Sequence, residues 1–264
     1  MIEKKVLAPD QFVEFQTQIS QLYEICFNEK LNPSLWEWAY LKNPTGEPII
    51  AVALEDGNLI AHYAMIPMPF EQDSNKLQGY LSMTTMVHPN FRKYGLFVEL
   101  ANMAYGQANK NSFVYGFPNA NSLPGFKKRL EWKVSSEYYI ASIGEHVLPM
   151  YQSSLKLEKL RKIRFDMSNP EFLAWRLSKP GNTYKCQNSL IYKEYKGMID
   201  LMNIDEGSLP FFNKCEKLFN ILTNDESLLS ASNSVQPYHF GVRSFGAQIN
   251  IESFSPTLIM SDVF

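Results

Sequence analysis

The stretch Met86-Val87-His88-Pro89-Asn90-Phe91-Arg92-Lys93-Tyr94-Gly95-Leu96-Phe97 joins a strand to a helix and decides how the fold is interpreted. An apolar strand over 79–87 stops at the proline, a short loop follows, and a helix over 96–108 begins just after Gly95. The first N–H groups of a helix have no internal acceptors and carry partial positive charge. A loop that leads into such a helix start, here with two basic residues, predicts an anion site suited to a pyrophosphate. The same pattern also occurs in proteins that bind nothing there.

The segments on either side of this stretch alternate between helical and extended patterns. Apolar residues recur at helical spacing from residue 10 to 26, and an Asp-Gly turn at 56–57 joins two extended runs. Strands are predicted over 4–8, 49–54, 59–68, 79–87, 113–117 and 133–142, and a further short helix over 122–130. This order predicts an α+β fold with one mixed, mostly antiparallel sheet that is flanked by helices and ends near residue 145.

A second, less regular half follows, and one motif in it repeats a motif of the first half. The segment 169–177 (Asn-Pro-Glu-Phe-Leu-Ala-Trp-Arg-Leu) matches 32–40 (Asn-Pro-Ser-Leu-Trp-Glu-Trp-Ala-Tyr) in its Asn-Pro pair and in the spacing to a tryptophan. This match predicts a degenerate internal repeat, with chance similarity as the alternative. We therefore expect two domains, 1–145 and 146–264, of which the second is a smaller α+β half.

The composition argues against several classes of protein. With 25 Lys and Arg, 27 Asp and Glu and a formal charge of −2, the 264-residue chain lacks the basic surface of a nucleic-acid binder. No apolar run is long enough for a membrane span or a signal peptide, so we expect a cytoplasmic protein without a membrane partner. The cysteines Cys26, Cys186 and Cys215 are odd in number and far apart, which argues against a disulfide framework or a metal site.

The loop resembles the acyl-CoA loop of the GCN5-related N-acetyltransferase superfamily, whose pattern is Arg/Gln-x-x-Gly-x-Gly/Ala. Arg92, Gly95 and Phe97 fall on its three defined positions. The preceding Val87-His88-Pro89 resembles the Val-x-Pro that often ends the fourth strand in that family. The order of elements is also similar, so the resemblance covers about residues 1–145.

The resemblance implies that acetyl-CoA is the co-substrate and lies where the fourth and fifth strands separate, around 83–87 and 115–119. The backbone of Met86 and Val87 would hold the pantetheine arm. The loop that takes the pyrophosphate would consist of Arg92, Lys93, Tyr94, Gly95, Leu96 and Phe97. An amine would attack the thioester directly, and alignment of the reactants together with donors to the oxyanion would supply much of the rate.

Two departures from the family pattern carry expectations of their own. Phe97 replaces the last small residue of the loop, so one side of the loop is expected to be reshaped. Many members also carry a tyrosine, four residues before the glycine of a Gly-Phe pair, that protonates the leaving thiolate. Here Leu130-Glu131-Trp132 stands in place of Gly-Phe and the tyrosine position is Lys127, so this role is vacant or filled from elsewhere.

Three side chains are candidates for catalysis. His88 lies at the mouth of the expected CoA site and is a candidate base or relay, with a local hydrogen bond at the strand end as the alternative. His62 lies on the third strand, from which it could reach the acceptor amine, with a satisfied sheet histidine as the alternative. Asn119 follows the fifth strand and either bonds CoA or the acceptor or caps the next helix.

Candidates for substrate binding come from both halves of the chain. They are Tyr115, Asn121, Tyr238 and Arg243. The last two belong to a polar and aromatic cluster with His239 and Phe240 that could stack a nucleotide base and pair with a phosphate, or form an ordinary strand end. The basic run 127–129 could meet the 3′-phosphate of CoA or be a solvated helix face.

These observations predict an acetyl-CoA-dependent N-acetyltransferase that acts on a small amine, with a second half that encloses the acceptor. The loop end Gly-Leu-Phe and the segment Gly116-Phe117-Pro118-Asn119 resemble bacterial enzymes that acetylate nucleotide-linked amino sugars. That resemblance implies a dTDP-linked 3- or 4-amino-dideoxyhexose and a role in polysaccharide biosynthesis. A tandem-type aminoacyl or peptidyl transferase and a non-catalytic CoA-binding module are the alternatives. The aromatic content of 14% is compatible with a homodimer.

Overall fold

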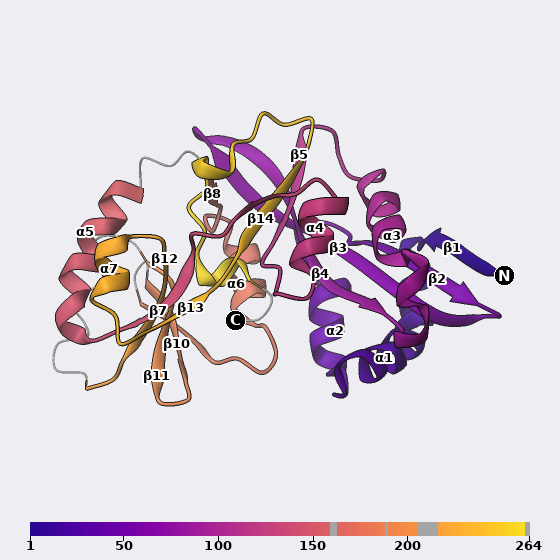
Figure 1. Cartoon of the computed structure of the whole chain (residues 1–264), viewed down its shortest axis with the longest axis horizontal. Helices are drawn as coiled ribbons and strands as arrows, with labels where there is room; N and C mark the ends of the chain where they lie inside the picture. Colours follow the sequence, from indigo (N-terminus) through magenta and orange to yellow (C-terminus); the bar gives the residue numbers. More distant parts are fainter. Residues whose placement is uncertain (159–162, 188–189, 205–215, 262–264) are drawn as a thin grey trace.

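Two neighbouring β-sheets organise the molecule, and a shared apolar core lies between them (Figure 1). The computed structural model describes residues 1–158, 163–187, 190–204 and 216–261. Among these residues, no helix combines the length and the apolar character needed to cross a membrane.

The first sheet contains eight strands. In spatial order they are β1 (Ile2–Val6), β2 (Ile49–Glu55), β3 (Asn58–Gln72), β4 (Asn75–Val87), β5 (Ser112–Gly116), β14 (Phe240–Phe245) and β6 (Lys133–Ser135), and β8 (Ile163–Phe165) pairs with the end of β3. Neighbours run antiparallel except β4 and β5, which are parallel. Asp56 and Gly57 have φ angles of 50° and 81°, as the predicted tight Asp-Gly hairpin between β2 and β3 requires.

Two pairs of helices cover the first sheet, one pair on each face. They are α1 (Phe12–Phe27), α2 (Pro33–Tyr40), α3 (Leu96–Tyr105) and α4 (Leu123–Arg129). Successive strand residues point to opposite faces. Thus Ile50 and Val52 of β2 pack with α1 and α2, whereas Ala51 and Ala53 pack with α3 and α4.

The second sheet contains six strands. In spatial order they are β13 (Ser234–Pro237), β7 (Tyr139–Ile143), β12 (Phe219–Thr223), β11 (Met198–Asn203), β10 (Leu190–Tyr195) and β9 (Tyr184–Gln187). Only β11 and β12 among the paired strands are parallel. The helices α5 (Leu148–Glu158) and α7 (Glu226–Ser230) pack on one face, and α6 (Pro170–Leu177) packs on the face toward the first sheet.

The two halves of the chain exchange their last strands. After β6, the chain leaves the first sheet, and β7 inserts between β12 and β13 of the second. After β13, the chain leaves the second sheet, and β14 inserts between β5 and β6 of the first (Figure 1). The exchange is reciprocal, so each sheet is completed by a strand from the other half.

The helices α2 and α6 meet between the sheets through two buried tryptophans. The rings of Trp38 and Trp175 stack with centroids 4.4 Å apart and 3° between their planes. Trp38 Nε1–H donates to the carbonyl oxygen of Trp175 at 2.7 Å, and Trp175 Nε1–H donates to that of Trp38 at 2.9 Å. Each helix is also capped by an asparagine, Asn32 or Asn169. Equivalent residues of the two motifs therefore make the same contacts in both directions, which supports the predicted internal repeat.

The predicted fold class is confirmed, and the strand exchange corrects two details. The strand predicted over 133–142 is two strands in different sheets, because residues 136–138 cross from one sheet to the other. The expected boundary at residue 145 does not separate the sheets, since β7 lies in the second and β14 in the first. Alternating apolar residues indicate a strand but not the sheet that it joins.

Replacing Trp175 by Phe is expected to lower the free energy of unfolding by about 1–3 kcal/mol. The variant keeps a stacked ring but leaves the buried carbonyl of Trp38 without its donor. Trp38→Phe is expected to cost less, because the carbonyl oxygen of Trp175 also accepts from the backbone N–H and the hydroxyl of Ser178. Urea unfolding measures both, with Tyr195→Phe at an exposed position as a control expected within about 0.5 kcal/mol of the wild type. Stabilities of both tryptophan variants equal to the control would contradict this role of the pair.

Candidate functional site

A cavity opens where the two parallel strands of the first sheet separate. β4 and β5 pair at Gly79–Phe113, Tyr80–Val114 and Leu81–Tyr115. Beyond these pairs, residues 82–85 and 116–120 line a cavity of about 780 Å³. Its volume is within the range of about 300–1,000 Å³ of small-molecule sites. The cavity lies at the strand separation where the family resemblance implies that acetyl-CoA binds.

The remaining walls of this first cavity come from three other parts of the chain. They are Tyr23, Phe27, Leu31, Leu35, Trp36 and Tyr40 from α1, α2 and the loop between them, Ser122, Phe126 and Trp132 at α4, and residues 236–239 from the second half. None of the described lining residues is Asp, Glu, Lys or Arg. Two polar atoms in these walls, Trp36 Nε1 and His239 Nδ1, are buried and make no hydrogen bond to the described residues. A ligand in the cavity can supply the missing partners.

His62 holds a bulge of β4 beside this cavity. The register of β3 and β4 shifts between His62 and Ala64, and Thr84 adopts a φ of 54°. His62 Nδ1 donates to the carbonyl oxygen of Thr84 at 2.8 Å, because a carbonyl can only accept. Burial lowers the pKa of His62 to about 4, so its ring is neutral at pH 7. His62 therefore lies in the sheet rather than in the cavity wall, which agrees with the alternative that it is a histidine of the sheet and not a base.

The loop after β4 has the form predicted for an anion site. Residues Pro89–Tyr94 form a 3₁₀ turn, and α3 begins directly after Gly95. Gly95 has a φ of 73°, a conformation that favours glycine. The side chains of Arg92, Lys93 and Tyr94 are exposed, and Arg92 Nε reaches the carbonyl oxygen of Val87 at 3.5 Å. Two basic groups therefore stand at the start of α3.

His88 has a local hydrogen bond in this loop. Its Nδ1 accepts from the backbone N–H of Asn90 at 3.3 Å, which caps the 3₁₀ turn.

The two residues before the loop, Met86 and Val87, pair with His62 and Ala61 in the sheet. Met86 is buried and Val87 is half-buried, and neither residue lines the first cavity, so their role in holding the pantetheine arm stays a prediction.

Phe97 packs against α4, and this contact explains how a large residue replaces a small one in the loop. The Phe97 ring lies 5.0 Å from that of Phe126, edge to face. A Cβ atom on Gly125 would come within 2.6 Å of Phe97 Cε1. The ring thus occupies space that Gly125 leaves open, and the reshaping expected from Phe97 lies at the contact of α3 with α4.

Asn119 lines the first cavity and also caps the turn before α4. Its Oδ1 accepts from the backbone N–H groups of Asn121 and Ser122, both at 3.0 Å. Both alternatives considered for Asn119 are therefore compatible with its position. Asn121 is exposed on the turn, outside the cavity wall.

The connection between β13 and β14 brings Tyr238 and His239 into the wall of the first cavity. The Tyr238 ring stacks on Phe117, with centroids 4.9 Å apart, and its hydroxyl bonds the Ser261 hydroxyl at 2.5 Å. Tyr238 was a candidate from the sequence, whereas His239 appeared only as its neighbour in a cluster. His239 reaches the cavity wall because β14 inserts beside β5, and no local sequence pattern indicates that insertion.

Two other substrate-binding candidates lie away from the cavity, so the structure corrects their expected roles. Tyr115 is fully buried, and its hydroxyl donates to the carbonyl oxygen of Met260 at 3.1 Å. Arg243 donates to the carbonyl oxygen of Leu130 at 2.9 Å and pairs with Glu131 at 3.3 Å, so it holds the connection from α4 to β6. Strand alternation explains both errors, because neighbouring residues point to opposite faces of the sheet.

The remaining predicted groups lie on the surface or outside the described residues. Residues 127–129 form the exposed last turn of α4. Cys186 is exposed, Cys26 is partly buried, and burial raises the pKa of the Cys26 thiol. Cys215 lies outside the residues that the structure describes.

Gly125→Ala is expected to destabilise the fold by about 1–3 kcal/mol, because the new methyl group forces Phe97 to move. In a Phe97→Ala background the same substitution should cost nothing measurable, since the clash is gone. Urea unfolding of the wild type, both single variants and the double variant measures this coupling. Equal effects of Gly125→Ala in the two backgrounds would contradict the proposed packing.

The stability of the protein is expected to fall between pH 6.5 and 4 through His62. The lowered pKa means that the unfolded chain binds a proton in this range while the folded protein does not. The contribution of neutral His62 to the free energy of unfolding is complete above about pH 6.5 and is lost as the pH falls to about 4. This contribution amounts to about 3 kcal/mol. His62→Gln keeps a donor for Thr84 but does not titrate. Urea unfolding at several pH values should therefore show a flatter profile for this variant, and identical profiles would contradict the assignment.

Comparison with known proteins gives one family match. Residues 14–135 match the family model described as an acetyltransferase (GNAT) domain. No sequence among the curated proteins matches the chain. The matched segment runs from α1 to β6 and includes the two separating strands and the loop at Gly95.

Solved structures share the fold of nearly the whole chain at low sequence identity. A GCN5-related N-acetyltransferase from Kribbella flavida is 9% identical, covers 93% of this chain and 72% of its own, and has a TM-score of 0.61. An Enterococcus faecalis V583 protein of unknown function, described as a probable N-acyltransferase, is 11% identical, with coverages of 94% and 74% and a TM-score of 0.61. A GCN5-related N-acetyltransferase from Anabaena variabilis is 11% identical, with coverages of 92% and 73% and a TM-score of 0.54. These likenesses show the fold.

The family match and the fold agree with the geometry of the first cavity. The expectation that the chain is an enzyme of the N-acetyltransferase class is confirmed. Over residues 14–135 the chain is similar to the acetyltransferase (GNAT) domain family.

Proposed function

We propose that this enzyme transfers an acetyl group from acetyl-CoA to the amine of a small acceptor in the first cavity. One observation carries the proposal: the cavity opens where β4 and β5 stop pairing, and β4 then leads directly into the loop at Gly95. An extended ligand can therefore lie between the strands while its anionic end meets the start of α3.

The donor side of the site suits a pantetheine chain followed by a pyrophosphate. Backbone N–H and C=O groups at a strand separation need hydrogen-bond partners, and pantetheine has amides that can provide them. The segments 82–85 and 116–120 border the space where such a chain would lie. At the loop, the start of α3 and the side chains of Arg92 and Lys93 favour an anion. The thioester supplies an activated acetyl group.

His239 is the group best placed to take the proton from the attacking amine. The described lining residues include no carboxylate, lysine or arginine, and His239 is the histidine among them. His62 and His88 are each engaged with backbone groups outside this wall. As the amine forms its bond to the acetyl carbon, the electron pair of the C–S bond goes to sulfur and the N–H proton goes to His239. The thiolate takes a proton from solvent.

The walls of the first cavity favour the uncharged part of an acceptor. Phe117 and Tyr238 offer a stacked aromatic surface, and the hydroxyl and amide groups can bond a sugar. Because the described wall carries no cation, a diphosphate would lie outside it. A dTDP-linked 3- or 4-amino-dideoxyhexose remains the first acceptor that we propose to test, followed by amines without phosphate.

Thiol release from acetyl-CoA in the presence of these amines tests the proposed reaction. Acetyl-CoA at about 100 times its Kd should also stabilise the protein by about 2.7 kcal/mol, which raises the melting temperature by several degrees. Binding without thiol release on any amine would favour a non-catalytic CoA-binding module. No binding at millimolar acetyl-CoA would refute the proposed function.

His239→Gln is expected to lower kcat/KM by about 10²–10⁴-fold and to remove the limb of the pH–rate profile that reports the base. The shift in melting temperature with acetyl-CoA should stay as in the wild type, since the donor lies against other residues. His146→Gln, at an exposed position, is the matched control. An unchanged rate for His239→Gln would exclude this residue as the base without excluding the transfer itself.

A further inference from the structure

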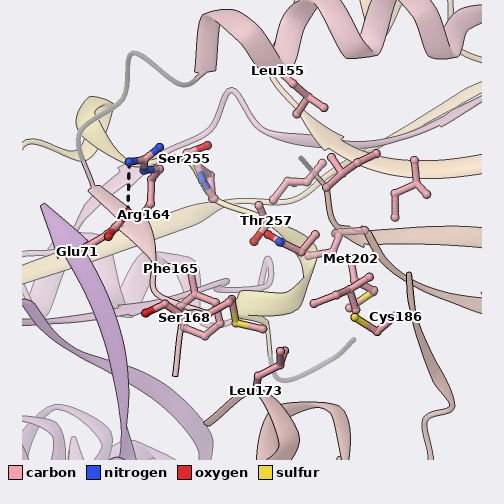
Figure 2. A pocket seen from close by; sticks show the side chains of 18 of the residues that line it. Glu71, Leu155, Arg164, Phe165, Ser168, Leu173, Cys186, Met202, Ser255 and Thr257 are labelled. Carbon is pink, nitrogen blue, oxygen red and sulfur yellow. Dashed lines mark ion pairs between the residues drawn. The ribbon is translucent and has the colours of Figure 1, made fainter. Parts of the chain in front are cut away.

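A second cavity, of about 550 Å³, lies at the equivalent place of the second sheet (Figure 2). β11 and β12 are parallel and pair at Ile199–Phe219 and Asp200–Asn220. Beyond these pairs, residues 201–204 of the first strand and Leu222 of the second line the cavity. The helices α5 and α6, which pack on opposite faces of the second sheet, also contribute walls to it. The repeat thus carries two cavities in corresponding positions.

The second cavity differs from the first in the chemistry of its walls. Counting from the last paired residues aligns Ser82 with Leu201, Thr85 with Ile204 and Phe117 with Leu222. The Asn-Pro motifs align Trp36 with Leu173. Each of these changes replaces a hydroxyl or an aromatic ring by a branched aliphatic side chain. At these four positions the second cavity is more aliphatic than the first, whereas Asn203, which aligns with Thr84, keeps a polar group in its wall.

One end of the second cavity is charged. Arg164 Nη2 lies 3.2 Å from Glu71 Oε1, and the two side chains are 48% and 35% exposed. Figure 2 shows this pair and Ser255 at one end, with Leu173, Met202 and Cys186 toward the other. A guanidinium has five N–H donors, so Arg164 can bond a second carboxylate beside that of Glu71.

The wall also carries the polar side chains of Tyr151, Ser168, Asn203 and Thr257. The hydroxyl of Thr257 is buried and makes no hydrogen bond to the described residues. A ligand oxygen near the charged end can supply this partner.

We propose that the second cavity binds an aliphatic carboxylate, with its carboxylate at Arg164 and its alkyl chain against Leu173 and Met202. The charge at one end selects the head group, and the aliphatic walls select the tail. Leu155 of α5 and Leu222 of β12 border the chain from the second sheet. This site is separate from the one in which acetyl transfer is proposed, so either proposal can fail without the other.

Calorimetric titration with decanoate, using decanol as the uncharged analogue, tests the inference on the full chain. We expect decanoate to bind about 10-fold more tightly than decanol, because charge-assisted hydrogen bonds are the stronger ones. Arg164→Gln should remove this preference while decanol still binds. Arg129→Gln, on the exposed turn of α4, should bind as the wild type does.

Two substitutions place the site in the second cavity. Leu173→Trp introduces the residue found at the equivalent position of the first half and should abolish binding of both probes. Leu155→Trp fills the cavity from the half-buried position on α5 and should do the same if Leu173→Trp fails to fold. The inference is overturned if decanoate does not bind, if binding survives whichever tryptophan variant folds, or if acetyl-CoA displaces decanoate.

Discussion

The contact between Trp38 and Trp175 is the constraint on which the arrangement of the two halves depends. Each indole N–H finds its acceptor only on the opposite helix, and the stack leaves no room for water between the rings. A buried N–H without a partner costs about 1–3 kcal/mol, so both bonds hold or fail with the approach of α2 to α6. Because the helices belong to equivalent motifs, the contact joins corresponding parts of the two halves.

The contact of α2 with α6 brings the two halves together at the point where they exchange strands. The strand exchange in turn completes the wall of the first cavity. With α2 and α6 face to face, the end of each half lies close to the sheet of the other, where β7 and β14 insert. Insertion of β14 next to β5 carries residues 236–239 to the edge of the separated strands. In the proposed function, the acceptor side of the site is supplied in part by the second half, and the donor side by the first. Residues of both halves therefore line the first cavity.

The sequence was sufficient where local geometry determines the outcome. The glycine at 95, the helix after it and the Asp-Gly hairpin were predicted because turn and helix-start chemistry acts within a few residues. The repeat was visible because a short motif keeps its spacing. The strand exchange was not predictable, since β7 has the same alternation whichever sheet it joins, and the position of His239 in the cavity wall follows from it. Location in the cytoplasm and assembly as a homodimer stay predictions.

The exchanged strand also sets when the enzyme can become active. β14 pairs with β5 across more than a hundred residues of sequence, so the ends of a very long loop must meet before the sheet is complete. During synthesis, residues 236–239 are made after the strands β1 to β12. A nascent or prematurely terminated chain therefore has the anion loop but only part of the acceptor wall. In the proposed function, the chain therefore becomes able to react only after β14 has paired with β5 and residues 236–239 have completed the wall of the first cavity.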